Sequence, residues 1–464
     1  MTVTDLIHVL YILSFALFVY GLSGLTGPRT AVRGNLVAAV GMALAVLATL
    51  LTPGTGHWWL IAAGMLIGTA VGVPSARRVK MTAMPQMVAL FNGVGGGAVA
   101  LISWVEFRDT HGYAATAGYV PVTSLFAAIV GSVSFWGSLI AFGKLQEVLP
   151  GRPTGLGRAQ QPLDLALLAA AVGCAVTIGP GNDSSWLILG LLCAAAVLGV
   201  TVVLPIGGAD MPVVISLLNA FTGLSAAATG LALDNTALIV AGMIVGASGT
   251  ILTNLMAKAM NRSIPAIVAG GFGGGGASGP PGSGPGDRTV RQTNAADAAI
   301  QMAYANQVVI VPGYGMAVAQ AQHTVRELAK LLEQRGVEVK HAIHPVAGRM
   351  PGHMNVLLAE ADVPYEQMRE MEDINGEFPR TDVVLVIGAN DVTNPAARTD
   401  PASPIYGMPI LDVDRARSVI VLKRGMSPGF AGVENELYFN PRTTMLFGDA
   451  KASVAEIAEE LKAL

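Results

Sequence analysis

Nine apolar stretches of membrane-spanning length fill the first 258 residues and constrain the fold more than any other feature of this sequence. A helix that crosses a bilayer needs about 20 predominantly apolar residues. Turn residues such as Gly27-Pro28, Pro53-Gly54 and Pro150-Gly151 separate the stretches. We predict spanning helices near residues 5–25, 34–52, 57–74, 87–106, 122–143, 163–180, 185–205, 211–231 and 237–258.

The basic residues predict the orientation of these spans. Only 11 of the 28 Lys and Arg residues lie in residues 1–262, and all of these except Arg108 fall in loops on one side. Loops rich in Lys and Arg remain in the cytoplasm. We therefore expect a multi-pass protein of the cell inner (plasma) membrane, with its N-terminus outside and everything after residue 258 in the cytoplasm.

Polar groups inside the predicted spans are few. No Lys, Arg, Asp, Glu or His lies near the middle of a span, and Asp210 lies at a span end. Asn92 and Asn219 are central and can line a water-filled path, because polar groups in a membrane often mark function. The alternative is that each asparagine hydrogen-bonds a neighbouring helix. The two cysteines, Cys174 and Cys193, lie in apolar runs and predict neither a disulfide nor a metal site.

A run of Gly, Pro and Ser over residues 270–286 separates the apolar part from an ordinary charged sequence. Such a composition is typical of a flexible tether. We predict a membrane domain over residues 1–262, a linker over 263–289 and a soluble domain over 290–464.

The soluble part alternates strand and helix patterns. This alternation predicts a doubly wound α/β domain with a parallel sheet. We expect strands at Val308–Val311, Glu338–Ile343, Val383–Gly388 and Ser418–Leu422, and helices at Ala317–Glu333, Met354–Ala361 and Ala452–Leu464.

A glycine turn follows the first predicted strand. Gly313-x-Gly315 begins a dinucleotide-binding fingerprint, but Val318 occupies the third position, where Gly or Ala is usual. In such a turn the backbone N–H groups of a helix N-terminus approach a pyrophosphate. The alternative is a strand–helix turn that merely needs glycine torsions.

The end of the second predicted strand bears on the choice of nucleotide. An NAD site usually has an Asp or Glu there for the ribose hydroxyls, but residues 339–345 contain no acid. The missing acid favours NADP. Lys423-Arg424 follows a later strand and can hold the 2′-phosphate, although a solvated basic pair explains it equally well.

Three more loops leave the same predicted sheet edge, and their convergence indicates a cleft. They are residues 346–352, 388–391 and 425–432. Asp391 is a candidate proton-sensing carboxylate. It is equally well explained as an Asx turn or a helix cap before Pro395.

Taken together, these motifs resemble the beta subunit of the proton-translocating nicotinamide nucleotide transhydrogenases over essentially the whole chain. The resemblance rests on the segments 312–318, 343–352, 388–391, 423–424 and 446–451, and in the membrane half on 210–219 and 259–263. It implies a Re/Si-specific, proton-translocating enzyme in which hydride passes from NADH to NADP⁺ while protons move inward. It also implies NADP(H) on the C-terminal domain, NAD(H) on an alpha subunit of one or two chains, and a dimer of protomers.

The resemblance assigns roles to individual residues. Asn390 and Asp391 would lie near the nicotinamide and couple protonation to cofactor binding, and Asn92, Asp210 and Asn219 would belong to the proton path. The residues implied in cofactor binding are Gly313, Tyr314, Gly315, Val318, Val346, Ala347, Gly348, Arg349, Met350, Pro351, Gly388, Asn390, Asp391, Lys423, Arg424, Gly429, Phe430, Gly432, Asp449 and Ala450.

The sequence departs from the family pattern at two places. Asn92 stands where many bacterial relatives have a membrane histidine, so we expect the proton-carrying histidine on a partner's helix. Gly425 and Phe430 stand where relatives often have Ser and Tyr. Each change removes a hydroxyl, so we expect NADP(H) to be held less tightly or the loop to open more easily.

Two other classes of function remain open from the sequence. One is a channel or transporter gated by a nucleotide-sensing domain, and the other is a membrane anchor with an inert nucleotide fold. The net charge of −3 and the lack of a basic stripe argue against a nucleic-acid partner. Hydride exchange between nucleotides, measured with the partner chains present, discriminates the enzyme from both alternatives.

Overall fold

The computed structural model describes most of the chain. The described residues are 3–25, 28–54, 56–80, 83–114, 116–150, 154–207, 210–261, 263–269, 289–350, 352–429 and 431–464. The whole predicted glycine tether, residues 270–286, and the predicted site residues Pro351 and Phe430 lie outside these ranges. The chain divides into two compact units, which are Met1–Pro205 with Val214–Leu252, and Ile206–Val213 with Thr253–Leu464. The predicted domain boundaries at 262 and 289 stay predictions.

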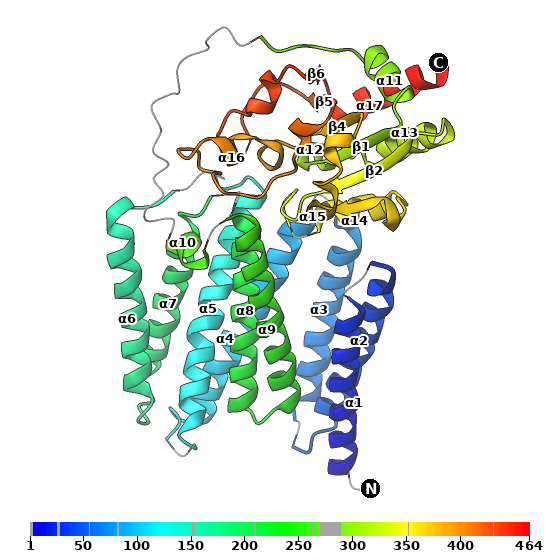
Figure 1. Cartoon of the computed structure of the whole chain (residues 1–464). Helices are drawn as coiled ribbons and strands as arrows, with labels where there is room; N and C mark the ends of the chain where they lie inside the picture. Colours follow the sequence, from blue (N-terminus) through cyan, green and yellow to red (C-terminus); the bar gives the residue numbers. More distant parts are fainter. Residues whose placement is uncertain are drawn as a thin grey trace. The chain divides into compact units, whose positions relative to one another are not determined.

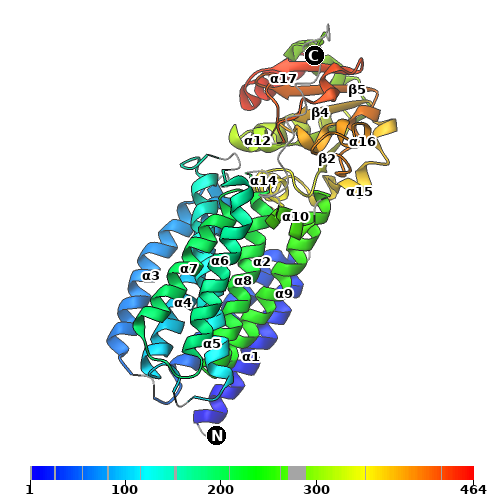
Figure 2. The ribbon, with the colours of Figure 1, turned by 90° about the vertical axis from the view of Figure 1, so that its left-hand side faces the viewer.

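All nine predicted spans are helices long and apolar enough to cross a membrane within the described residues (Figure 1). They are α1 Val3–Gly24, α2 Pro28–Leu50, α3 Trp58–Arg78, α4 Met84–Asp109, α5 Tyr119–Leu145, α6 Gln160–Ile178, α7 Ser185–Val203, α8 Met211–Ala232 and α9 Thr236–Ala259. A short helix, α10 (Ile264–Ala269), follows inside the region predicted as linker. The turned view shows the nine long helices running roughly side by side (Figure 2).

Small residues bring α4 and α5 into backbone contact. A methyl group added at Gly131 would lie 2.7 Å from the carbonyl oxygen of Gly96, and one added at Gly96 would lie 2.9 Å from that of Gly131. Lipid supplies little hydrophobic force between helices, so close packing of this kind holds them together. The glycines that interrupt the fourth predicted span are therefore its packing surface.

The C-terminal part is a six-stranded sheet in the order β3-β2-β1-β4-β5-β6, with every neighbouring pair parallel. The doubly wound, Rossmann-like α/β prediction is confirmed, because this is the strand order of two βαβαβ halves. The strands are β1 Gln307–Pro312, β2 Glu338–Ile343, β3 Met368–Glu370, β4 Val383–Ile387, β5 Ser418–Lys423 and β6 Thr443–Phe447. The short strands β3 and β6 were not predicted.

The sheet is buried on both faces. Every residue of β1 and β4 is buried, as expected for a parallel sheet covered by helices. Alternate residues such as Val309, Val384 and Val421 join one core cluster with Phe378 and Tyr438. The helices of this part are α11 Ala295–Ala303, α12 Tyr314–Val318, α13 Gln322–Gln334, α14 His353–Glu360, α15 Met371–Ile374, α16 Ala396–Thr399 and α17 Ala450–Ala463.

The predicted helix Ala317–Glu333 was wrong, because two helices occupy this region. The first, α12, ends with the amide of Gln320 donating to the carbonyl of Ala317 and the amide of Ala321 donating to that of Met316. This is a Schellman motif, and its left-handed position is held by Gln320 (φ 52°) where glycine is usual. The glycine turn is therefore followed by a single helical turn.

We predict that Gly131→Ala lowers the thermal midpoint of the detergent-solubilised chain. The added methyl cannot fit against the Gly96 carbonyl, and overpacking of this kind costs about 1–3 kcal/mol. Gly173→Ala on α6 is the matched control, because a methyl there meets nothing within 4 Å. Equal midpoints for the two variants would show that α4 and α5 do not pack through these glycines.

Candidate functional site

The candidate site lies at one edge of the sheet. Because all six strands are parallel, their carboxyl ends meet at this edge. The chain order reverses between β1 and β4, and ligands of open α/β sheets bind at such switch points. The predicted cofactor-binding residues lie at the carboxyl ends of β1, β2, β4, β5 and β6 or in the loops and first helical turns that follow them, and Figure 1 labels these strands.

The turns after β1 and β4 touch through glycine. A methyl added at Gly313 would lie 2.3 Å from the amide nitrogen of Ala389, and one added at Gly315 would lie 2.7 Å from the Cα of Gly388. The amides of Gly313 and Gly315 donate to the carbonyls of Ile387 and Gly388 at 2.9 and 3.0 Å. Gly313 has extended torsions (φ −131°, ψ −177°), which any residue can adopt. Space, rather than a glycine torsion, therefore requires glycine at position 313.

His344 holds the start of the loop after β2. Its ring is buried, with the amide of Val346 donating to Nδ1 at 3.2 Å and the Pro409 carbonyl 2.8 Å from Nε2. Because Nδ1 accepts, Nε2 carries the hydrogen and donates to Pro409. Burial lowers the pKa of His344 to about 4, so the ring stays neutral at pH 7. Ala347, the next buried residue of this loop, is 5% exposed.

The same loop reaches the turn after β1. The guanidinium carbon of Arg349 lies 4.3 Å from the centre of the Tyr314 ring, which is the geometry of a cation–π contact. Gly348 and Met350 flank this arginine, and Gly348 has φ 103°. The structure thus brings together predicted residues from two separate motifs.

Asn390 is the centre of a partly buried hydrogen-bond network. Its Oδ1 accepts from the Asn435 amide at 3.1 Å and from the Tyr438 hydroxyl at 3.0 Å. The Asn435 amide also donates to the Asn390 carbonyl at 3.0 Å. Burial raises the pKa of Tyr438, so its hydroxyl stays protonated and donates.

Asp391 contacts the loop after β5. Its Oδ2 accepts from the amide of Ala431 at 3.0 Å, and a methyl added at Gly429 would lie 2.4 Å from its Oδ1. The backbone amide that it binds is 40 residues further along the chain, so this contact is neither an Asx turn nor a helix cap. Asp391 therefore ties the main chain at Ala431 to the turn after β4.

The two side chains of the basic pair Lys423-Arg424, at the end of β5, lie in different environments. Lys423 donates to the carbonyls of Gly425, at 3.0 Å, and Ser427. Burial lowers the pKa of Lys423, and the nearby Asp391 carboxylate opposes that shift. Arg424 is exposed. Arg424 can thus reach a solvent-borne phosphate directly, whereas two of the three N–H donors of Lys423 already bind the carbonyls.

The remaining predicted residues lie at helix ends and turns of the same edge. Asp449 caps α17, with Oδ1 accepting from the amides of Lys451 and Ala452 at 3.0 and 3.2 Å. Ala450 is buried behind it. Val318 is 43% exposed at the end of α12, and Gly432 is exposed with φ 70°.

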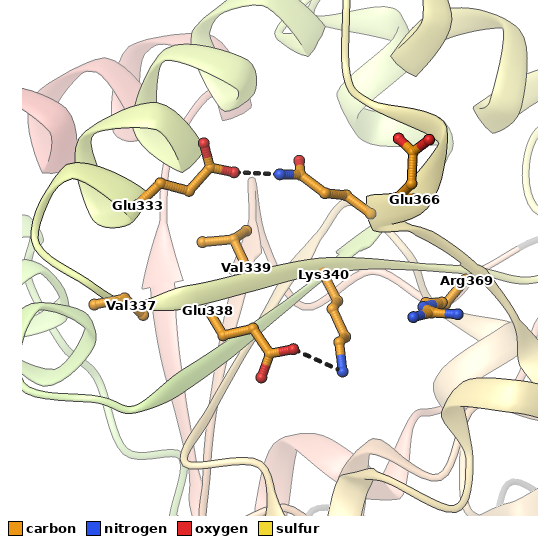
Figure 3. A pocket seen from close by; sticks show the side chains of 8 residues that line it. Glu333, Val337, Glu338, Val339, Lys340, Glu366 and Arg369 are labelled. Atoms are coloured by element: carbon orange, nitrogen blue, oxygen red, sulfur yellow. Dashed lines mark hydrogen bonds and ion pairs between the residues drawn. The ribbon is translucent and has the colours of Figure 1, made fainter.

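A hollow of about 270 Å³ lies away from the carboxyl edge, at the amino ends of β2 and β3 and beside the end of α13 (Figure 3). Two pairs of its polar side chains bind each other. Glu333 accepts from Gln367, and Lys340 pairs with Glu338 at 3.0 Å. None of the predicted cofactor-binding residues lines it. The carboxyl edge remains the candidate site.

Hydrogen bonds join three membrane helices around Asn92. Its amide donates to the hydroxyl of Ser138 at 2.9 Å and to that of Ser134 at 3.4 Å. Ser134 lies 2.6 Å from the hydroxyl of Thr222 on α8. Asn92 therefore does bind a neighbouring helix, but within the described residues its buried Oδ1 has no hydrogen-bond partner. Asn219 is partly buried on α8.

Two groups of interacting residues were missed from the sequence. Asn435 and Tyr438, which bind Asn390, come 45 and 48 residues after it, and no motif spacing marks them. In the membrane half, Asp164 is buried on α6, where its carboxylate accepts from the Thr201 hydroxyl on α7. The sequence signal for Asp164 was its position at the start of a predicted span.

A family model described as NAD(P) transhydrogenase beta subunit matches residues 7–460. This chain belongs to the NAD(P) transhydrogenase beta subunit family. The family is one of oxidoreductases that act on nicotinamide nucleotides, and a beta subunit implies an alpha partner. The predicted resemblance is therefore confirmed.

Two curated relatives support the assignment. Both are named NAD(P) transhydrogenase subunit beta and come from Rhodospirillum rubrum, one of them from a specified strain. Each is 49% identical to this chain over 456 residues, which is 97% of this chain and 98% of the relative. The similarity thus spans both the membrane helices and the sheet.

We predict that acid destabilises the sheet domain through its buried histidines, and that His341→Leu reduces this effect. Burial, with a contribution from Arg326, lowers the pKa of His341 to about 3 from an ordinary value of 6.5. The unfolded chain takes up the proton below pH 6.5, whereas the folded chain does not. Stability is therefore lost as the pH falls from 6.5 toward 3, by about 2 kcal/mol at pH 5 for one such histidine.

Thermal unfolding of the sheet domain within the full chain, followed between pH 7.5 and 5, measures this effect. Both ring nitrogens of His341 lack hydrogen-bond partners among the described residues, so leucine should be tolerated there at neutral pH. His323→Leu, at an exposed position, is the control and should keep the wild-type pH dependence. An unchanged pH dependence in His341→Leu would contradict the prediction.

Proposed function

We propose that residues 290–464 bind NADP(H) at the carboxyl edge of the sheet and that the chain works as the beta subunit of a proton-translocating transhydrogenase. The contact of Gly313 and Gly315 with Gly388 carries this proposal, because it places a glycine turn at the switch point of a dinucleotide-binding sheet. Bound NADP⁺ accepts hydride from NADH, which is held by the alpha subunit.

The residues at the edge fit NADP(H) better than NAD(H). The second strand, β2, ends at Ile343 and is followed by His344, so it does not end in the acidic residue that usually binds the ribose of NAD. A carboxylate there would repel a 2′-phosphate. Lys423 and Arg424 supply positive charge at the carboxyl end of β5, and we assign the 2′-phosphate to this pair.

The other roles follow the position of each loop. Gly313, Tyr314 and Gly315 lie where a pyrophosphate approaches the turn after β1, and residues 346–351 wrap the cofactor. Asn390 and Asp391 bind at the nicotinamide end, where the hydrogen bond from Ala431 to Asp391 ties the 425–432 loop to that end. Val318, Gly388, Asp449 and Ala450 complete the binding surface.

In the membrane half we assign the proton path to Asn92, Asp210 and Asn219. The buried Oδ1 of Asn92 supports this role, because a polar atom with no hydrogen-bond partner among the described residues is costly in a membrane unless water or a partner reaches it. Asn92 cannot itself carry a proton at physiological pH, so the proton-carrying histidine belongs to an alpha-subunit helix. Proton movement is inward, toward the cytoplasm.

The assembly and the location belong to the same proposal. The alpha subunit, as one chain or two, supplies the NAD(H) site, and the enzyme is a dimer of protomers. It resides in the cell inner membrane, with the N-terminus of this chain outside and residues 290–464 in the cytoplasm. The Gly- and Pro-rich linker lets the sheet domain move, so that protonation in the membrane changes how residues 258–264 and Asp210 meet that domain.

We predict that the full-length chain in detergent binds NADPH at least tenfold more tightly than NADH. Calorimetric titration with each nucleotide measures the preference. Lys423→Ala/Arg424→Ala should remove most of it, because a 2′-phosphate loses its charged hydrogen bonds. Lys330→Ala, at an exposed position on α13, is the control and should bind NADPH like the wild type. A preference for NADH would overturn the assignment and favour a nucleotide-gated transporter, and no binding at all would overturn it in favour of an inert nucleotide fold.

A further inference from the structure

His353 contacts the β2 loop at the point where that loop meets Tyr314. It is the first residue of α14, and only 1% of its surface is exposed. The amide of Arg349 donates to its Nδ1 at 3.0 Å. A methyl added at Gly348 would lie 2.4 Å from the same nitrogen. The loop backbone is therefore pressed against the acceptor face of the imidazole.

The Tyr314 ring lies beside both the Arg349 side chain and the His353 ring. The Arg349 guanidinium lies 4.3 Å from the ring centre, and the His353 ring centre lies 6.4 Å from it at an interplanar angle of 53°. Arg349 is thus held twice, at its main chain by His353 and at its side chain by Tyr314. The direction of the Arg349 side chain is therefore fixed by the residues that begin α12 and α14.

We propose that His353 is a positioning residue that sets the conformation of the 346–350 loop and thereby presents Arg349 to the nucleotide. The inference rests on the proposed NADP(H) site, and it adds a residue that does not itself touch the cofactor. A loop already fixed in its binding conformation loses less conformational entropy when the ligand arrives.

The chemistry of the ring fits this role. An imidazole must be neutral to accept a hydrogen bond at Nδ1. Burial, with a contribution from the Arg349 guanidinium, lowers the pKa of His353 to about 4, so the ring is neutral at pH 7. Its Nε2 then carries the hydrogen. That nitrogen is buried without a hydrogen-bond partner among the described residues, so the hydrogen bond to Arg349 is the one that orients the ring.

Hydrogen exchange in the full-length chain, without nucleotide, tests the positioning role directly. In His353→Phe the ring remains but the acceptor is lost, so amide exchange in peptides covering residues 346–350 should rise at least tenfold. In His353→Asn the side-chain oxygen can take the place of Nδ1, and exchange should stay near the wild-type rate. Unchanged exchange in His353→Phe, or equally fast exchange in both variants, would overturn the proposal.

A second variant removes the contact without altering the histidine. Gly348→Ala adds a methyl that must displace the ring, and at φ 103° it also strains the loop. It should raise exchange over the same peptides as His353→Phe does. If His353→Phe does not fold, the decision rests on this variant, and wild-type exchange in Gly348→Ala would reject the role of His353.

Binding of NADPH to the same proteins connects the loop to function. We expect the dissociation constant to rise about tenfold in His353→Phe and to return close to wild type in His353→Asn. If the wild-type chain does not bind NADPH, the proposed function fails, while the exchange measurement still decides whether His353 holds the loop. If exchange rises but affinity stays constant, the loop does not present Arg349 to the nucleotide and the inference fails.

Discussion

The approach of the turn after β1 to the turn after β4 is the contact on which the rest of the candidate site depends. Gly313 and Gly315 meet Gly388 and Ala389 so closely that no side chain fits between the two backbones. This contact forms the base of the candidate site, at the edge where the strand order reverses. The loops after β2 and β5 can reach over the same point from either side, because their strands flank β1 and β4. A larger residue in either turn would separate the two halves of the sheet domain at the edge where open α/β sheets bind ligands.

Much of this architecture could be predicted from the sequence, because the strongest patterns are long or periodic. The nine spans each carry about 20 apolar residues, and the buried strands β1, β4 and β5 are continuous apolar runs. Parallel pairing of these strands requires the loops that follow them to lie at one edge. The break after α12 could not be predicted, since Gln320 adopts a left-handed conformation that is usually reserved for glycine. Strands β3 and β6 were not predicted, because β3 has only three residues and β6 begins with two threonines rather than an apolar run.

The hydrogen-bond partners of individual side chains were harder to predict than the positions of the loops. Asn390 was selected from its motif, but Asn435 and Tyr438, which hold it, are brought there only by the tertiary fold. The same holds for Asp164 and Thr201, which lie on different membrane helices. A buried carboxylate is expensive in a membrane, so such residues persist where a partner compensates them. Sequence spacing reports neighbours within an element, whereas these pairs depend on how two elements cross.

The loop after β5 shows how opposite charges can fix one segment. Asp391 accepts a hydrogen bond from the main chain at Ala431, and Lys423 donates to main-chain carbonyls at Gly425 and Ser427. Each end of the loop is therefore bound by a charge of the sign that its backbone groups require. In the proposed site, a phosphate that binds Lys423 would compete with these carbonyls for its ammonium group. In the proposed function, nucleotide binding would thus act on this short segment, and such a segment suits a coupled enzyme because a ligand shifts an equilibrium only through its different affinities for two states.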